Sequence, residues 1–357
     1  MKNVAMTSPV RHPALTRPTL GKLVKAAGAC GLLALLIACP APAMAGITNA
    51  LTAWWHTLVP GLFPFFIAAE LAVSSGALGL IALPLRPLAK LMRCPVEAAG
   101  AFALSLFAGY PSGARLTGEL YREGKLTREQ ACYLAAFAGG TGPGIFASVG
   151  VGMYGDPGFG WILWVAMALA ALYTGWFFTL VPLRARGNAP AAAPPREEQS
   201  YRLTAVIGRS VTAILAVGGC MAAFAALAAI AQSLGLVTRL AGLLAGILPG
   251  ELTEGLLFGA LEMTTGLSIA AAAAPSPLAG AVLAGIISFG GAAVIAQIAG
   301  ALEPIRFPWG RLLATRLVQA LLAGLFAYLF LAMSFLPWAI GLALIPVAAA
   351  ALRRGRT

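Results

Sequence analysis

The chain has 357 residues, of which 60% are hydrophobic and 10% charged, and its mean hydropathy is +0.87. A soluble domain has about a quarter charged residues, so this composition is typical of an integral membrane protein and argues against soluble catalysis. The net charge of +12 is what cytoplasmic loops produce under the positive-inside rule, and it does not indicate a nucleic-acid partner.

The first apolar segment, residues 26–38, follows Lys22 and Lys25. Ala43-Met44-Ala45 behind it resembles a signal-peptidase site, so cleavage is one alternative. The polar lead is long for a signal peptide, and Trp54-Trp55 suits an interfacial belt that follows a retained helix. We therefore expect a retained first crossing and a cytoplasmic N-terminus.

Further crossings are predicted by segments with few or no charges. They are residues 60–82, in which Glu70 is the only charge, 159–183 and 210–238. Arg316 and Arg353 bracket an uncharged segment that is too long for one helix, and Leu336-Pro337 divides it. This pattern predicts a C-terminal helical hairpin.

Four other apolar segments are interrupted by glycine, proline or polar residues, which unwind helices. Residues 96–123 break at Gly109 to Gly113, and residues 240–274 break at Glu262 to Gly266, with arms too short to cross. Residues 127–153 break at Gly139 to Gly144, and residues 278–301 break at Ser288 to Gly291. The first two predict re-entrant hairpins, and the others predict broken transmembrane helices.

A hairpin followed by a broken helix thus occurs twice, at a nearly constant offset. The matched residues are Pro95 with Pro249 and Glu97 with Glu251, 154 residues apart, Gly113 with Gly266, 153 apart, and Gly139 with Gly290, 151 apart. Three crossings between the two hairpins would invert the second copy, so we expect an all-α polytopic fold with an inverted repeat. Chance matches between common membrane glycines and prolines are the alternative.

The basic residues agree with this topology. With the N-terminus inside, 23 of the 24 Lys and Arg residues, Arg316 among them, fall on the cytoplasmic side, and Arg239 is outside. The expected parts are an N-terminal cytoplasmic segment and first transmembrane helix at 1–45, a first repeat at 46–183, a flexible cytoplasmic linker at 184–203, a second repeat at 204–316, and a C-terminal hairpin with a basic tail at 317–357.

Four motifs carry a family resemblance. They are Leu62 to Ile67 (LFPFFI), Phe107 to Thr117 (FAGYPSGARLT), Glu262 to Gly266 (EMTTG) and Ser288 to Gly291 (SFGG). In this order they resemble the YlbJ family of sporulation integral membrane proteins, from about residue 53 to residue 316. The chain departs from the family at Ile295-Ala296-Gln297, where a histidine is expected before Ala-Gln.

The resemblance implies a nucleoside-recognition, or gate, domain similar to the transport core of concentrative nucleoside transporters. It also implies movement of dipicolinic acid across the outer forespore membrane during sporulation. Independently, unwound backbone at membrane depth is stable only against protein or a wet cavity. Four breaks around a pseudo-two-fold axis would therefore surround one midplane site, where helix N-termini favour an anion.

The candidate substrate-binding residues are Tyr110, Ser112, Gly113, Arg115, Thr141, Gly142, Glu262, Thr264, Thr265, Ser288 and Gln297. Arg115 is expected to pair with a substrate carboxylate, or else to lie on a hairpin arm that reaches cytoplasmic water. Glu262 is expected to take a proton, coordinate a cation or hold the hairpin tip by accepting N–H bonds.

Other polar residues are expected to have structural roles. Glu97 and Glu251 suit the first turns of the hairpin arms, where a carboxylate is favoured by the helix dipole. Glu70 is expected to form a helix–helix hydrogen bond, and His56 to be interfacial. The five cysteines are scattered and form no CxxC pair, so they suggest neither disulfides nor zinc: Cys30, Cys39, Cys94, Cys132 and Cys220.

The favoured function is a secondary carrier or facilitator for a small organic anion, with export of dipicolinate from the mother-cell cytoplasm supplied by the resemblance. A non-transporting gate-fold scaffold or assembly factor, and a nucleoside carrier, are the alternatives. The sequence contains no HExxH, GxSxG or Walker motif, so we expect no enzymatic activity, no metal and no cofactor. The expected partners are the anion, membrane lipid and further copies of the chain.

Overall fold

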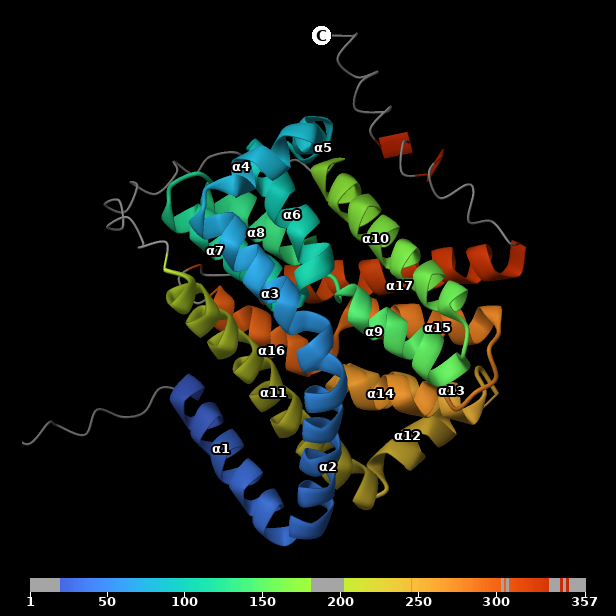
Figure 1. Ribbon diagram of the computed structural model, residues 1–357. Coiled ribbons are helices and arrows are strands. Elements are labelled where there is room, and N and C mark those ends of the chain that lie inside the picture. Colours follow the sequence, from blue (N-terminus) through green and yellow to red (C-terminus); the bar gives the residue numbers. More distant parts are fainter. Residues whose placement is uncertain are drawn as a thin grey trace, which may run out of the picture. The chain divides into compact units, whose positions relative to one another are not determined.

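Helices make up the regular structure of the described residues, which are 20–180, 202–244, 246–302, 305, 308–333, 341–342 and 345–346 of the computed structural model (Figure 1). The chain divides into residues 1–41 and residues 42–357. The described part of the first unit is essentially one helix, α1 (Leu20–Ala38). All sites discussed below belong to the second unit.

The helices of the second unit follow one order twice: a long helix, short connecting helices, a close pair, an interrupted helix and a long helix. The first series is α2 (Pro40–Ala53), η1 (Trp54–Leu58) and α3 (Val59–Ser74), then α4 (Ala77–Ala82), η2 (Leu83–Leu85) and α5 (Arg86–Met92), then α6 (Val96–Ala108) with α7 (Tyr110–Arg122), α8 (Arg128–Phe137) with α9 (Pro143–Ala147) and η3 (Ser148–Met153), and α10 (Pro157–Leu180). The second is α11 (Leu203–Ser233), α12 (Leu236–Leu243), α13 (Gly250–Leu261) with α14 (Met263–Ala270), α15 (Pro277–Phe289) with α16 (Gly291–Ala301), and α17 (Trp309–Met333).

Five helical segments among the described residues are long and apolar enough to cross a membrane. They are Pro40–Ser74, Pro157–Phe178, Leu203–Ser233, Pro277–Ala301 and Trp309–Met333. Residues 77–92 and 96–108 add a sixth if that pair, bent by 104°, is one span. The architecture is therefore that of a polytopic α-helical membrane protein, as the composition predicts. Residues 26–38, the predicted first crossing, form a shorter apolar helix.

Trp54 and Trp55 lie inside the continuous helical segment Pro40–Ser74, and their place at a membrane interface stays a prediction. They form part of the π-helical turn η1, which also contains the exposed His56. The Trp54 indole N–H donates to the Ile214 carbonyl at 3.1 Å, and the ring packs on Gly218. Trp54 thus joins this long segment to α11.

The C-terminal helix begins earlier than predicted. Because α17 starts at Trp309, Arg311 and Arg316 belong to the helix, and the predicted boundary after residue 316 falls inside it. Arg316 is fully buried, so it is not the loop residue that the charge pattern suggested. The predicted second arm of the hairpin, around Leu336-Pro337, and most of the linker at 184–203 lie outside the described residues.

Both predicted helix pairs double back on themselves. Between α6 and α7, Gly109 has φ 84° and ψ 171°, a conformation that is open to glycine. Glu97 and Glu123, at the far ends of this pair, line a common pocket. In the second pair α13 ends and α14 begins at Glu262, and a Cβ on Gly266 would overlap the backbone of Gly259. Each pair is a close antiparallel hairpin.

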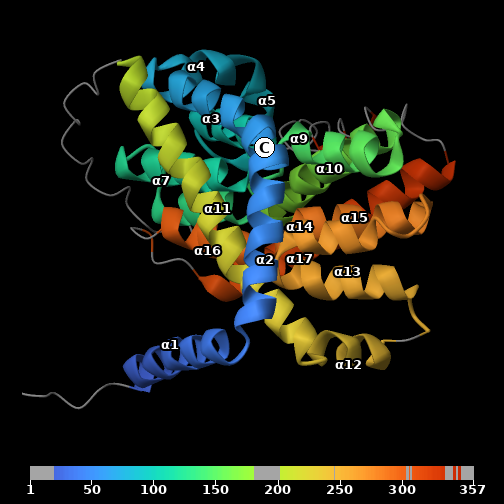
Figure 2. The same cartoon turned by 60° about the horizontal axis from the view of Figure 1, so that its bottom comes forward.

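The two predicted helix interruptions are also present. Between α8 and α9 the backbone is unwound at residues 138–142, and between α15 and α16 the left-handed Gly290 (φ 82°) and Gly291 (φ 74°) separate the segments. Figure 1 and Figure 2 show α3 to α8 gathered at one end of this unit and α12 to α15 at the other. The interruptions lie between these ends.

Candidate functional site

The four breaks meet at one small space, which we call the inner cavity. Its volume is about 40 Å³, and its polar lining comes from Tyr110, Thr141, Glu262, Thr264 and Gln297. These residues come from the two hairpin tips, the unwound segment before α9, and α16 just beyond the second interruption. Five of the predicted site residues are therefore brought together although they span almost 190 positions of sequence.

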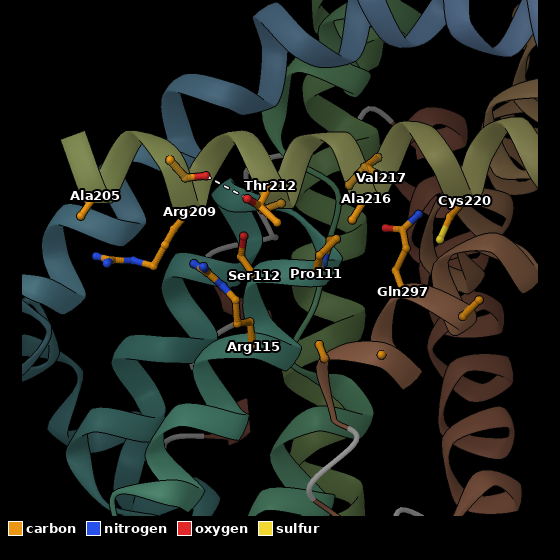
Figure 3. Close-up of a pocket in the computed structure, with 15 residues that line it drawn as sticks. Pro111, Ser112, Arg115, Ala205, Arg209, Thr212, Ala216, Val217, Cys220 and Gln297 are labelled. Atoms are coloured by element: carbon orange, nitrogen blue, oxygen red, sulfur yellow. Dashed lines mark hydrogen bonds between the residues drawn. The ribbon is translucent and has the colours of Figure 1, made fainter. Parts of the chain in front are cut away.

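A larger cavity of about 680 Å³, which we call the arginine cavity, lies between α7, α11 and α16 (Figure 3). Ser112 and Arg115 line it from α7, Arg209 and Thr212 from α11, and Gln297 from α16. The rest of its wall is formed by small or apolar residues. Pro111, Val217 and Gln297 line both cavities, so the two spaces are neighbours.

The charge of the arginine cavity is set by three side chains from three helices. Arg209 Nε lies 2.8 Å from Glu70 Oε2, and Arg115 pairs with Glu70 Oε1. The Glu70 side chain is 4% exposed, whereas those of Arg115 and Arg209 are 24% and 32% exposed. The expected helix–helix contact of Glu70 is thus an ion pair on both sides, and the three groups together carry one net positive charge.

Some predicted site residues lie away from both cavities. A Cβ on Gly113 would overlap the Ala138 carbonyl, and one on Gly142 would overlap the Phe107 carbonyl, so these glycines permit close packing of backbone on backbone. Thr265 contacts Glu262: its backbone N–H and its hydroxyl both donate to the Glu262 carboxylate. The Ser288 hydroxyl is buried and has no hydrogen-bond partner among the described residues.

Glu262 caps helix α14. Its Oε1 accepts from Thr264 N at 3.0 Å, while its Oε2 accepts from Thr265 N at 2.7 Å and from both threonine hydroxyls at 2.6 and 2.9 Å. Only 1% of the residue is exposed. Of the roles expected for it, accepting N–H bonds at the tip is the one this geometry displays. Glu97 and Glu251 lie in first helical turns, as predicted, after the N-cap residues Pro95 and Pro249.

A Glu262→Gln substitution is expected to lower the thermal unfolding midpoint in detergent. In either amide orientation the new NH₂ group faces a backbone N–H of Thr264 or Thr265, so one buried donor loses its acceptor, at a cost of about 1–3 kcal/mol. Glu251→Gln, at an exposed first-turn position of α13, is the control and should leave the midpoint unchanged. Equal midpoints for the two variants would contradict the capping role.

Arg316 reaches the first hairpin tip and the first interruption from α17. Its Cζ lies 4.6 Å from the centroid of the Tyr110 ring, and its Nη1 is 3.5 Å from the Gly139 carbonyl and 3.4 Å from Gln319 Oε1. Its Nε and Nη2 have no hydrogen-bond partner in the described part of the chain. The buried guanidinium of Arg316 therefore packs on the ring of Tyr110, and Tyr110 in turn lines the inner cavity.

Sequence reasoning missed Arg209, Thr212 and Arg316. Arg209 was assigned to a loop because the charge-free segment begins after it, yet α11 begins six residues earlier, at Leu203. Glu70 was the available signal, because a lone acid within a predicted span calls for a basic partner. For Arg316 no sequence signal marked its proximity to Tyr110.

The fold and the cavities define an integral membrane protein with helices interrupted around an internal polar site. The described residues contain no group of three or more His, Cys, Asp or Glu residues that could hold a metal ion. The chain is 27% identical over 334 residues to the sporulation integral membrane protein YlbJ of Bacillus subtilis (strain 168), covering 86% of this chain and 82% of that protein. This similarity supports the resemblance to the YlbJ family that the four motifs indicate. No protein-family model and no solved structure matches it.

Proposed function

We propose that this protein is a secondary carrier or facilitator for a small organic dianion, which binds between Arg115 and Arg209. The observation that carries the proposal is the arginine cavity itself: two guanidinium groups from different helices at one edge of a largely apolar space of about 680 Å³. A guanidinium fork matches a carboxylate, and apolar walls suit a planar ring. Dipicolinate, the substrate implied by the family resemblance, has both features.

Transport requires that the site open alternately to each side of the membrane. In the proposed inverted repeat, one half can move against the other around the site and so open it to either side. Reciprocal packing supports it: α8 packs on α17 while α15 packs on α10, and the equivalent long helices contact each other, α3 with α11 and α10 with α17. A pseudo-two-fold axis would relate these pairs of contacts. In this arrangement the two hairpins are re-entrant and the interrupted helices meet near mid-membrane.

The proposed orientation places the N-terminus in the cytoplasm. Cysteine labelling of Asp156→Cys and Ser276→Cys should then occur from outside, and that of Gly187→Cys and Ser200→Cys from inside. The Tyr154 hydroxyl donates to the Ala273 carbonyl at 3.1 Å, which brings the segments before Asp156 and Ser276 together. External labelling of Ser200→Cys, or opposite labelling of Asp156→Cys and Ser276→Cys, would contradict the topology.

Two other functions remain as alternatives. A gate-fold scaffold or assembly factor would need no continuous path for a solute, and a nucleoside carrier would need no paired cations. The arginine pair favours the anion over both. The family relationship suggests the outer forespore membrane as the location, and no ATP-binding motif is present in the sequence, so a gradient or partner would supply the energy. Uptake of labelled dipicolinate by sealed vesicles that contain only this protein tests the proposal.

A further inference from the structure

Glu70 occupies an unusual position beside the arginine cavity. It is the only charged residue of α3, it is 3% exposed, and its two carboxylate oxygens pair with Arg115 of α7 and Arg209 of α11. The arginines line the cavity but Glu70 does not. The Glu70 carboxylate therefore pairs with both arginines outside the cavity lining.

The charge balance of this cluster changes when a dianion enters. Two arginines and one glutamate carry a net charge of +1, so a bound dianion would leave −1 in a partly desolvated site. Unbalanced buried charge is strongly unfavourable. Neutralising Glu70 restores a balance of two positive and two negative charges and frees both guanidinium forks for the ligand.

Few other titratable groups lie close enough to the arginine pair to change their charge in place of Glu70. The elements packed against α3 are α4, α6, α9, α11 and η1. Of these, α4 and α9 contain no titratable residue, α6 contains Glu97 in its first turn, and η1 contains the exposed His56. Beyond Arg115 on α7 lie Glu119 and Arg122, and neither forms an ion pair with Glu70 among the described contacts. Arg115 and Arg209 are the charges that face it.

We propose that Glu70 is an internal anion that holds the arginine pair while the cavity is empty and takes up one proton from water when a dianion binds. The inference rests on the proposed anion carrier function and adds its coupling: each dianion enters with one proton. Because binding consumes a proton, affinity should rise as the pH falls, by up to tenfold per pH unit while Glu70 changes its charge.

Isothermal titration calorimetry of purified protein with dipicolinate tests this coupling. Binding heats measured in two buffers of different ionisation enthalpy give the number of protons taken up. The wild type should take up close to one. Glu70→Gln, which keeps an oxygen acceptor for the arginines, should bind dipicolinate without proton uptake and with an affinity independent of pH. Glu97→Gln, on the neighbouring α6, is the control and should match the wild type.

The outcomes separate this inference from the function on which it rests. If neither wild type nor Glu70→Gln binds dipicolinate, the anion site itself is wrong. If both bind and take up the same number of protons, the site stands and the role of Glu70 is overturned. If Glu70→Gln does not fold, the wild type alone still tests the proposal. Binding of dipicolinate by the wild type without proton uptake would contradict it. Glu70→Asp, which keeps the carboxylate, should retain the uptake.

Discussion

Replacing either Arg115 or Arg209 by glutamine should weaken dipicolinate binding by about tenfold to a hundredfold, and replacing both should leave no measurable binding. A hydrogen bond to a charged group contributes about 1.5–3 kcal/mol, and in the proposed site each guanidinium would make such bonds with one carboxylate of the ligand. Arg115→Lys keeps the charge but not the fork, so it should lose less than Arg115→Gln. Calorimetry measures all of these affinities.

Two comparisons make this prediction specific. A neutral analogue, the diamide of the same ring, should be affected far less than the dianion. Arg122→Gln removes the same charge from the same helix, but Arg122 donates to the Gly118 carbonyl and does not line the cavity, so this variant should bind normally. Wild-type affinity in both Arg115→Gln and Arg209→Gln would rule out the arginine cavity as the binding site.

Replacing Arg316 by methionine should reduce dipicolinate transport by about tenfold or more while leaving the protein folded. The buried guanidinium has no carboxylate within ion-pair distance among the described residues, and desolvating a charge costs several kcal/mol. Its cation–π contact with Tyr110 contributes about 2 kcal/mol at most, and the 3.5 Å contact with Gly139 is shared by Gln319. Stability should therefore be unchanged or higher.

Transport should fall because Arg316 places a fixed positive charge 4.6 Å from the ring of Tyr110, which lines the inner cavity, and the proposed carrier would pass the anion through this space. Arg311→Met is the matched control, since Arg311 lies exposed on the same helix. Transport rates and thermal unfolding midpoints together separate a role of Arg316 in transport from a role in stability. A lowered midpoint with transport lost in proportion would show that Arg316 is only structural.

The breaks could be predicted from sequence because their causes are local. Gly109, Gly290 and Gly291 adopt left-handed or otherwise glycine-dependent backbone angles, and Pro143 begins a helix after an unwound segment. Repeated spacing then indicated that the breaks belong to two equivalent sets. That they converge on one inner cavity followed from the need to keep unwound backbone away from lipid.

Helix boundaries near arginines could not be predicted in the same way. A search for charge-free segments ends a predicted span at the nearest arginine, whereas Arg209 and Arg316 lie inside helices. Their positions depend on partners far away in sequence, Glu70 for one and Tyr110 for the other. The role of a glycine is also ambiguous from sequence. Gly113 and Gly142 permit close backbone packing, but a glycine that contacts a ligand would look the same in the sequence.

Dipicolinate uptake by sealed vesicles that contain only this protein is the most direct test of the central claim. Labelled dipicolinate should accumulate at a rate that saturates with its concentration, faster than in protein-free vesicles, and unlabelled dipicolinate should compete while its diamide should not. The double substitution of Arg115 and Arg209 by glutamine should reduce the rate to that of protein-free vesicles. Uptake equal in wild-type and protein-free vesicles, with the wild-type protein folded and inserted, would contradict the transport function and favour a scaffold.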